Sequence, residues 1–132
     1  MNILKGIIEN LKVNGSLTFV KVAVNDQKIS AILIDTPSTE PFLKIGNEIS
    51  VIFKETEVII GKGNVTNISL QNKFFGKITN ITSKNLLSKI TINTTVGNIS
   101  SIITTNAVNQ LNLTENCEVT AMIKTNEIIL SA

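Results

Sequence analysis

The sequence predicts a mainly β protein made of two small barrels in tandem, each with about five strands and one short helix. The first observation behind this prediction is an internal repeat. Shifting the 132-residue chain by 70 positions aligns residues 4–62 with 74–132 without a gap, and 12 of the 59 pairs are identical. The second is that short apolar runs alternate with turn residues through both copies, which is typical of β structure. We therefore expect one module over residues 1–63 and a second over 64–132.

Both copies give the same order of elements. Strands are expected over 4–12, 17–24 and 28–34, and again over 74–82, 87–94 and 98–104. The run "LTFVKVAV" (17–24) alternates, with Thr18, Val20, Val22 and Val24 on one face of the strand. Asn25-Asp26 and Val96-Gly97 supply the turns between the second and third strands.

The last part of each copy is expected to hold a short helix and a hairpin. In the second copy Thr105 can cap the helix of "NAVNQLNL", whereas Pro41 limits the first copy to about one turn after Thr36. Residues 45–61 and 115–131 then read as hairpins, with Lys54 and Lys124 at or near their tips. Five short strands and one helical turn per copy correspond to a pair of OB-like barrels.

Composition excludes several classes of function. The chain has no His, Trp or Tyr, all 12 positive side chains are Lys, and Cys117 is the single cysteine. Soft-metal sites and nucleophile–imidazole pairs are therefore excluded, and the ten scattered carboxylates do not suggest an enzyme. A net charge of +2 with five Phe and no Arg is a poor basis for binding nucleic acid. No long apolar segment occurs, so we expect a soluble, cytoplasmic protein without membrane association.

Two runs of the second copy resemble a known family. Residues 68–81, "ISLQNKFFGKITNI", resemble the opening of the molybdate-binding Mop module, also called the TOBE domain, whose signature is Ile-Ser-Ala-Arg-Asn-x-x-x-Gly. Residues 100–130, with a helix ending in Leu-x-Leu and then "VTAMIK", resemble the rest of that module. The resemblance covers residues 68–132 and extends more loosely to 4–62 through the repeat. Two tandem copies are similar to the di-Mop molybdate-binding proteins.

The resemblance implies an oxyanion site and the residues that form it. The family's binding strand, hairpin lysine and strand-end threonine fall on Ser69, Leu70, Gln71 and Asn72, on Lys124 with Thr125 beside it, on Lys54 by repeat equivalence, and on Thr104. The chain departs from the family in two ways. Gln71 stands where the signature has Arg, and the first copy has no signature strand, because its equivalent of Ser69 would precede Met1.

Molybdate is a tetrahedral dianion with four acceptor oxygens, and the hydroxyl, amide and ammonium donors of these residues suit it. We therefore expect a non-catalytic protein that stores or buffers molybdate or tungstate in the cytoplasm. The family resemblance further implies a homotrimer with sites at module interfaces. Two alternatives remain open: residues 69–72 as a plain linker, and a regulatory or assembly module that binds a protein partner without the anion. An OB-like nucleic-acid binder is disfavoured.

Overall fold

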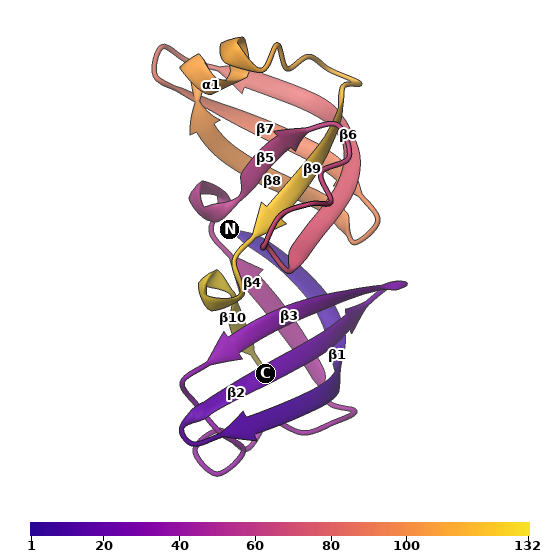
Figure 1. Cartoon of the computed structure of the whole chain (residues 1–132), viewed down its shortest axis with the longest axis vertical. Helices are drawn as coiled ribbons and strands as arrows, with labels where there is room; N and C mark the ends of the chain where they lie inside the picture. Colours follow the sequence, from indigo (N-terminus) through magenta and orange to yellow (C-terminus); the bar gives the residue numbers. More distant parts are fainter.

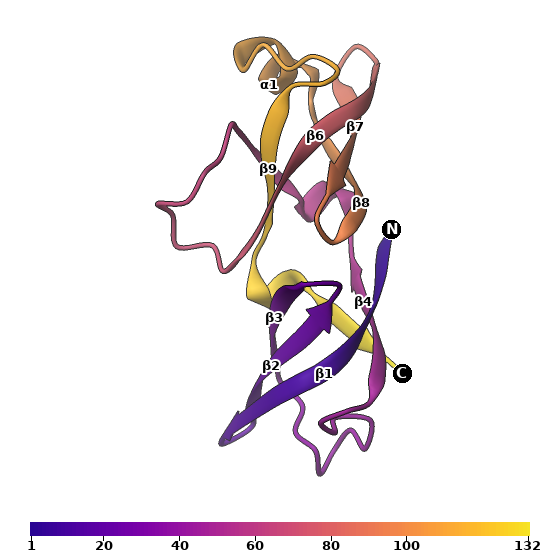
Figure 2. The ribbon, with the colours of Figure 1, turned by 90° about the vertical axis from the view of Figure 1, so that its right-hand side faces the viewer.

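The computed structural model describes all residues, 1–132, as two curled β-sheets that follow one another along the long axis of the molecule (Figures 1 and 2). The first half of the chain contains β1 (Asn2–Asn14), β2 (Leu17–Val24), β3 (Gln27–Leu33), β4 (Glu48–Phe53), the 3-10 turn η1 (Glu55–Glu57) and β5 (Ile59–Lys62). The second half contains β6 (Asn72–Ser83), β7 (Leu87–Thr94), β8 (Gly97–Thr104), α1 (Thr105–Gln110), β9 (Glu118–Ile123), the 3-10 turn η2 (Thr125–Glu127) and β10 (Ile129–Ser131). Equivalent elements lie 70 residues apart, as the repeat predicts.

The mainly β, OB-like fold predicted from the sequence is confirmed. Each sheet has five strands, and the strand pairs are antiparallel. The alternation in β2 appears as predicted: Thr18, Val20, Val22 and Val24 are buried, while Lys21 is exposed. Buried apolar residues of both halves form one connected core of 25 residues, so the two sheets share their interior. None of the helices has the length and apolar character needed to span a membrane.

The last strand of each half lies in the sheet of the other half. The first sheet has the order β10-β4-β1-β2-β3 and the second β5-β9-β6-β7-β8. The predicted hairpins over 45–61 and 115–131 are therefore wrong. The physical reason is that η1 and η2 do not reverse the chain, since Lys54 and Val58, which flank η1, both have extended backbone. The chain continues across the junction, and Val58 is buried there.

The short helix after the third strand is present in the second half only. Its cap is Thr104 rather than the predicted Thr105, because the Thr104 hydroxyl accepts a hydrogen bond from the Ala107 N–H at 3.1 Å. The Thr105 hydroxyl instead donates to the Lys84 carbonyl at 2.7 Å. In the first half the chain makes a single turn, closed by the Glu40 N–H and the Thr36 carbonyl at 2.8 Å, which agrees with the expected effect of Pro41.

Two buried asparagines close the free edges of the sheets. The Asn72 amide donates to the Ser30 carbonyl at 2.9 Å and accepts from the Ser30 N–H at 2.8 Å. Asn2 makes the same two bonds with Ser100, both at 2.8 Å. Because β3 and β8 are edge strands, these backbone groups have no neighbouring strand. Each half therefore uses the first residue of its first strand to satisfy the edge of the other half.

We predict that Asn72→Ala destabilises the protein by about 2–4 kcal/mol, because it leaves the N–H and carbonyl of Ser30 unpaired in a buried place. Chemical denaturation followed by circular dichroism measures the change. Asn80→Ala, an exposed position on the same strand, is the matched control and should change stability by less than about 0.5 kcal/mol. Equal unfolding free energies for the two variants would show that the amide bridge contributes nothing.

Candidate functional site

The candidate binding residues Ser69, Leu70 and Gln71 lie outside any strand. They belong to an irregular segment between β5 and β6, and only Asn72 starts β6. The expectation of a binding strand is thus corrected to a loop. Its cause is the register: Asn72 pairs with Ile123 at the end of β6 and β9, beyond which the chain turns away into η2. Figure 2 shows this loop projecting from the side of the molecule.

The loop is tied down at both ends. At its start the Thr120 hydroxyl donates to the Gly63 carbonyl at 2.7 Å and accepts from the Val65 N–H at 2.9 Å. At its end the Lys73 ammonium donates to the Leu70 carbonyl at 2.7 Å. The residues in between therefore leave the body of the protein and return to it at fixed points.

The structure brings the end of this loop beside Lys124. Since Asn72 pairs with Ile123, Gln71 and Lys124 are the residues just beyond the ends of the paired strands β6 and β9. Figures 1 and 2 both place the loop end near the turn that leads from β9 into η2. Gln71, Lys124 and Ser69 are exposed, and their side chains make no hydrogen bond within the chain. These side-chain donors are available to a ligand.

Asn72 has a structural task at this site. Its side chain is fully buried, and both of its polar atoms are bonded to the Ser30 backbone. One of its two N–H groups is already used, so it presents at most one donor. Its main effect is to hold the end of the loop against β3 through the two hydrogen bonds with Ser30.

Lys73 is a further candidate that the sequence reasoning missed. It lies in β6, and its ammonium reaches back to the Leu70 carbonyl, so it adds a positive charge at the end of the loop. The signal was its place in the strand: side chains alternate along a strand, so the neighbour of buried Asn72 must point to the other face. Its repeat equivalent in the first half is Ile3, which carries no charge.

Thr104 and Lys54 lie away from this cluster. Thr104 caps α1, at the far end of the second sheet from η2 (Figure 1). Lys54 precedes η1, where the first half crosses to the other sheet beside β8. Figure 2 places the N-terminus, which marks that side of the junction, opposite the projecting loop. Of the residues expected from the sequence, Gln71 and Asn72 lie beside Ile123 and Lys124 at the end of the β6–β9 pairing. Ser69 and Leu70 precede them in the loop, and Thr125 follows Lys124 in η2.

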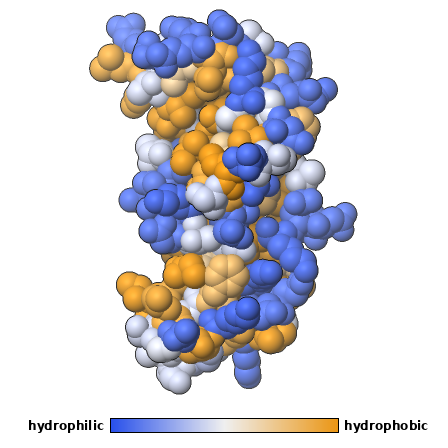
Figure 3. Space-filling view, in the orientation of Figure 1, coloured by the Kyte–Doolittle hydropathy of each residue, from blue (hydrophilic) through white to orange (hydrophobic).

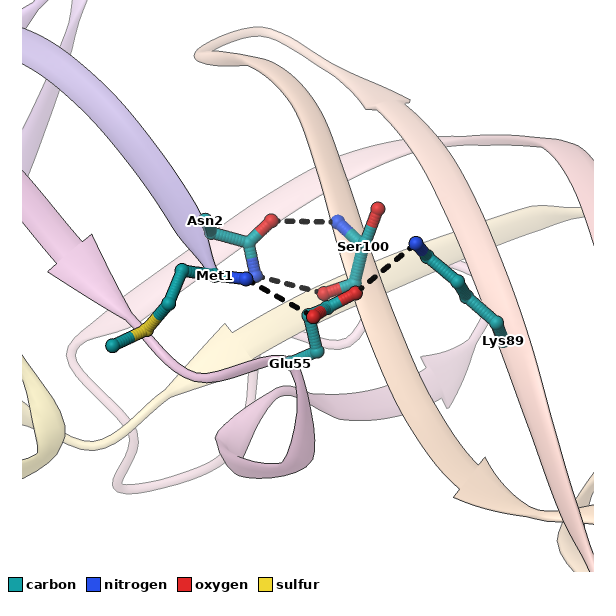
Figure 4. Close-up of polar contacts among 5 residues, drawn as sticks. All are labelled: Met1, Asn2, Glu55, Lys89 and Ser100. Carbon is teal, nitrogen blue, oxygen red and sulfur yellow. Dashed lines mark hydrogen bonds and ion pairs between the residues drawn. The ribbon is translucent and has the colours of Figure 1, made fainter.

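Charged groups fill the equivalent place in the first half (Figure 4). The Glu55 carboxylate is 3.0 Å from the N-terminal ammonium of Met1 and 3.3 Å from the Lys89 ammonium. The hydrogen bond from the Met1 ammonium lowers the pKa of Glu55, and Lys89 acts in the same direction, so the carboxylate stays ionised at neutral pH. The Asn2–Ser100 bridge lies beside these charged groups (Figure 4). Its equivalent in the other half is the Asn72–Ser30 bridge.

Other parts of the surface offer no competing chemistry. No group of three or more His, Cys, Asp or Glu side chains is placed to hold a metal ion. One surface hollow, of about 600 Å³, includes Lys5, Ile7, Glu48 and Ser50 in its lining and contains none of the candidate residues. We prefer the loop because Gln71 and Lys124, which lie beside the end of the β6–β9 pairing, have side-chain donors without a partner in the chain.

Comparison with known proteins gives a domain match and two similar solved structures. The TOBE domain model matches residues 68–130. A solved structure of the cytoplasmic molybdate-binding protein ModG, with molybdate bound, has a TM-score of 0.91, with 24% identity over 99% of this chain and 95% of that one. MopII from Clostridium pasteurianum covers 50% of this chain and 100% of its own length, with 25% identity and a TM-score of 0.48. A search of curated protein sequences gave no match.

The matched segment contains the end of the projecting loop, the buried Asn72, helix α1, and Lys124 with the turn η2 that follows it. It therefore contains the residues on which the resemblance was based, in the same order. The ModG likeness shows that the fold extends over the whole chain, including the first half. Residues 68–130 are therefore similar to the TOBE domain.

Proposed function

We propose that this protein binds molybdate, or the similar dianion tungstate, without catalysis and serves as a cytoplasmic store or buffer of the oxyanion. The observation that supports the proposal is that the end of the loop, with Gln71, lies beside Lys124 where β6 pairs with β9, and that neither Lys73 nor Lys124 forms an ion pair with a carboxylate. The match of residues 68–130 to the TOBE domain and the likeness to a molybdate-bound protein support it.

The chemistry of the cluster fits a tetrahedral dianion. Molybdate has four acceptor oxygens and no donor, so it needs hydroxyl, amide and ammonium groups from several sides. Ser69 offers an O–H, Gln71 an NH₂ group, and Lys124 a charge with three donors. Each hydrogen bond to a charged group contributes roughly 1.5–3 kcal/mol. Four or five such bonds are enough for micromolar binding after the cost of association.

Positive charge at the site does not depend on the signature arginine. Replacing Arg by Gln71 removes a fork of donors and one charge. Lys73, held by the Leu70 carbonyl in the same loop, supplies a charge close to the lost one. With Lys124, which directly follows β9, two ammonium groups remain to balance a dianion.

We also propose that three chains assemble into a homotrimer. Ile3, Ile52 and Ile129 lie side by side across β1, β4 and β10, and Ile3 and Ile129 are 58% and 50% exposed. Apolar side chains also reach the surface in several patches of the view in Figure 3. Exposed apolar rows of this kind mark interaction surfaces. They also favour the second candidate function, a module that binds a protein partner without the anion.

The lysine of the second half is expected to matter more than that of the first. Lys124→Ala should weaken molybdate binding about tenfold or more, since it removes a charged hydrogen bond next to the loop. Lys54→Ala, its repeat equivalent, is the matched control and should change little. Ser69→Ala should cost roughly 1–2 kcal/mol if its hydroxyl binds directly. Isothermal titration calorimetry compares the variants, and a larger loss for Lys54→Ala would move the site to the other half.

Selectivity tests whether the site is built for a large tetrahedral dianion. Molybdate and tungstate should bind with similar strength, and sulfate much more weakly, because the smaller anion cannot reach every donor at once. Calorimetry with the three anions at one ionic strength measures the ratios. Sulfate binding as tight as molybdate binding would reduce the loop to a general anion patch.

The assembly has a direct test. Light scattering at micromolar concentration should give three times the 14.3 kDa mass of the chain. Ile129→Lys, which places a charge in the apolar row, should lower that mass if the row lies in the interface. A wild-type monomer would argue against the trimer and against sites between chains.

A further inference from the structure

Where the two sheets meet, both halves have the same backbone arrangement but different side chains around it. We call this shared arrangement the frame. The frame is an amide bridge to the opposite edge strand, Asn72 to Ser30 in one half and Asn2 to Ser100 in the other. A crossing that begins with a lysine lies next to each bridge. Four repeat positions differ. Gln71, Lys73 and Thr125 in the second half correspond to Met1, Ile3 and Glu55 in the first, and Lys89, the partner of Glu55, corresponds to Phe19.

Glu55 is the difference with the largest electrostatic effect. It holds two cations, the Met1 ammonium and Lys89, and its own side chain is only 21% exposed. The bond to Lys89 joins the two halves, because Glu55 belongs to η1 and Lys89 to β7. Thr125 at the equivalent place carries no charge and has no ion pair.

We infer that Glu55 is a built-in counter-anion that closes a second oxyanion site at η1, between the halves, where Lys89 of β7 and the Asn2–Ser100 bridge lie and which Lys54 precedes. This inference rests on the proposed function. The carboxylate gives one oxygen to the Met1 ammonium and the other to Lys89, which is how two oxygens of a tetrahedral dianion would be held. The chain therefore binds oxyanion at the second-half loop and excludes it from the first-half position.

Charge explains why the carboxylate excludes the anion. A dianion entering this position would lie next to an ionised carboxylate and would have to replace its contacts with both cations. The carboxylate is part of the chain, so it competes at a high effective concentration whatever the amount of free anion. Removing its charge leaves the cations and the frame in place.

The test is to count molybdate sites by calorimetry and equilibrium dialysis in variants of Glu55. Glu55→Thr copies the residue found at the equivalent position 125, and we expect it to add one molybdate per chain to the wild-type number. Glu57→Thr is the matched control: it removes the same charge from the same turn, where Glu57 has no ion pair, and should leave the number unchanged. Adding Lys89→Gln to Glu55→Thr should remove the extra site.

Each outcome separates this inference from the proposed function. If wild-type protein binds no molybdate but Glu55→Thr does, the proposed function fails and the inference stands. If wild-type protein binds and Glu55→Thr adds nothing while keeping its circular dichroism spectrum, the inference fails. An equal gain with Glu57→Thr would also overturn it, as a general effect of charge. Glu55→Gln, which keeps the size of the side chain, replaces Glu55→Thr in the same comparison if the latter does not fold.

Discussion

The exchange of last strands between the two sheets is the constraint on which the rest of the structure depends. Because β5 pairs with β9 and β10 pairs with β4, the chain must cross the junction twice. Val58 and Ile128 anchor the two crossings, with exposures of 2% and 4%, and the Ser101 hydroxyl donates to the Val58 carbonyl at 2.8 Å. Neither half completes its sheet without the other, so we expect both to unfold together. The segment that matches the TOBE domain likewise ends in a strand that lies in the other sheet.

The candidate site follows from these crossings. Each crossing begins at a lysine and runs into a 3-10 turn that packs against the third strand of the other half. The asparagine that opens each half closes the edge of that same third strand. An amide suits this task because it offers one donor and one acceptor side by side, which a neighbouring strand would otherwise supply. The lysines, the loop and the edge strand therefore lie close to the junction. A ligand bound there would depend on the contact between the two halves.

The sequence predicted the elements well and their pairing less well. Alternation in β2 and the 70-residue repeat were sufficient for strands, turns and helix. The exchange was not predictable, because β5 and β10 are repeats of each other and pair in the same register: Ile129 opposite Ile52, and Ile59 opposite Met122. A local hairpin of β4 with β5, or of β9 with β10, would have paired the same types of residue. Asn2 was missed because the alignment began at residues 4 and 74, although extending it by two positions pairs Asn2 with Asn72.

The positions of the repeat that hold the frame, and the positions equivalent to Glu55 that were proposed to decide binding, are under different physical constraints. A side chain at Gly6 or Gly76 would collide with the backbone oxygen of Ala23 or Asn93, so both halves need glycine there. The buried asparagines are fixed in the same way by the polar groups that they satisfy. Positions 55 and 125 are half-buried in the turns η1 and η2, and these turns hold a carboxylate in one half and a hydroxyl in the other. A chain with two copies of one fold can therefore keep both frames while only one of them retains the charge pattern that an oxyanion requires.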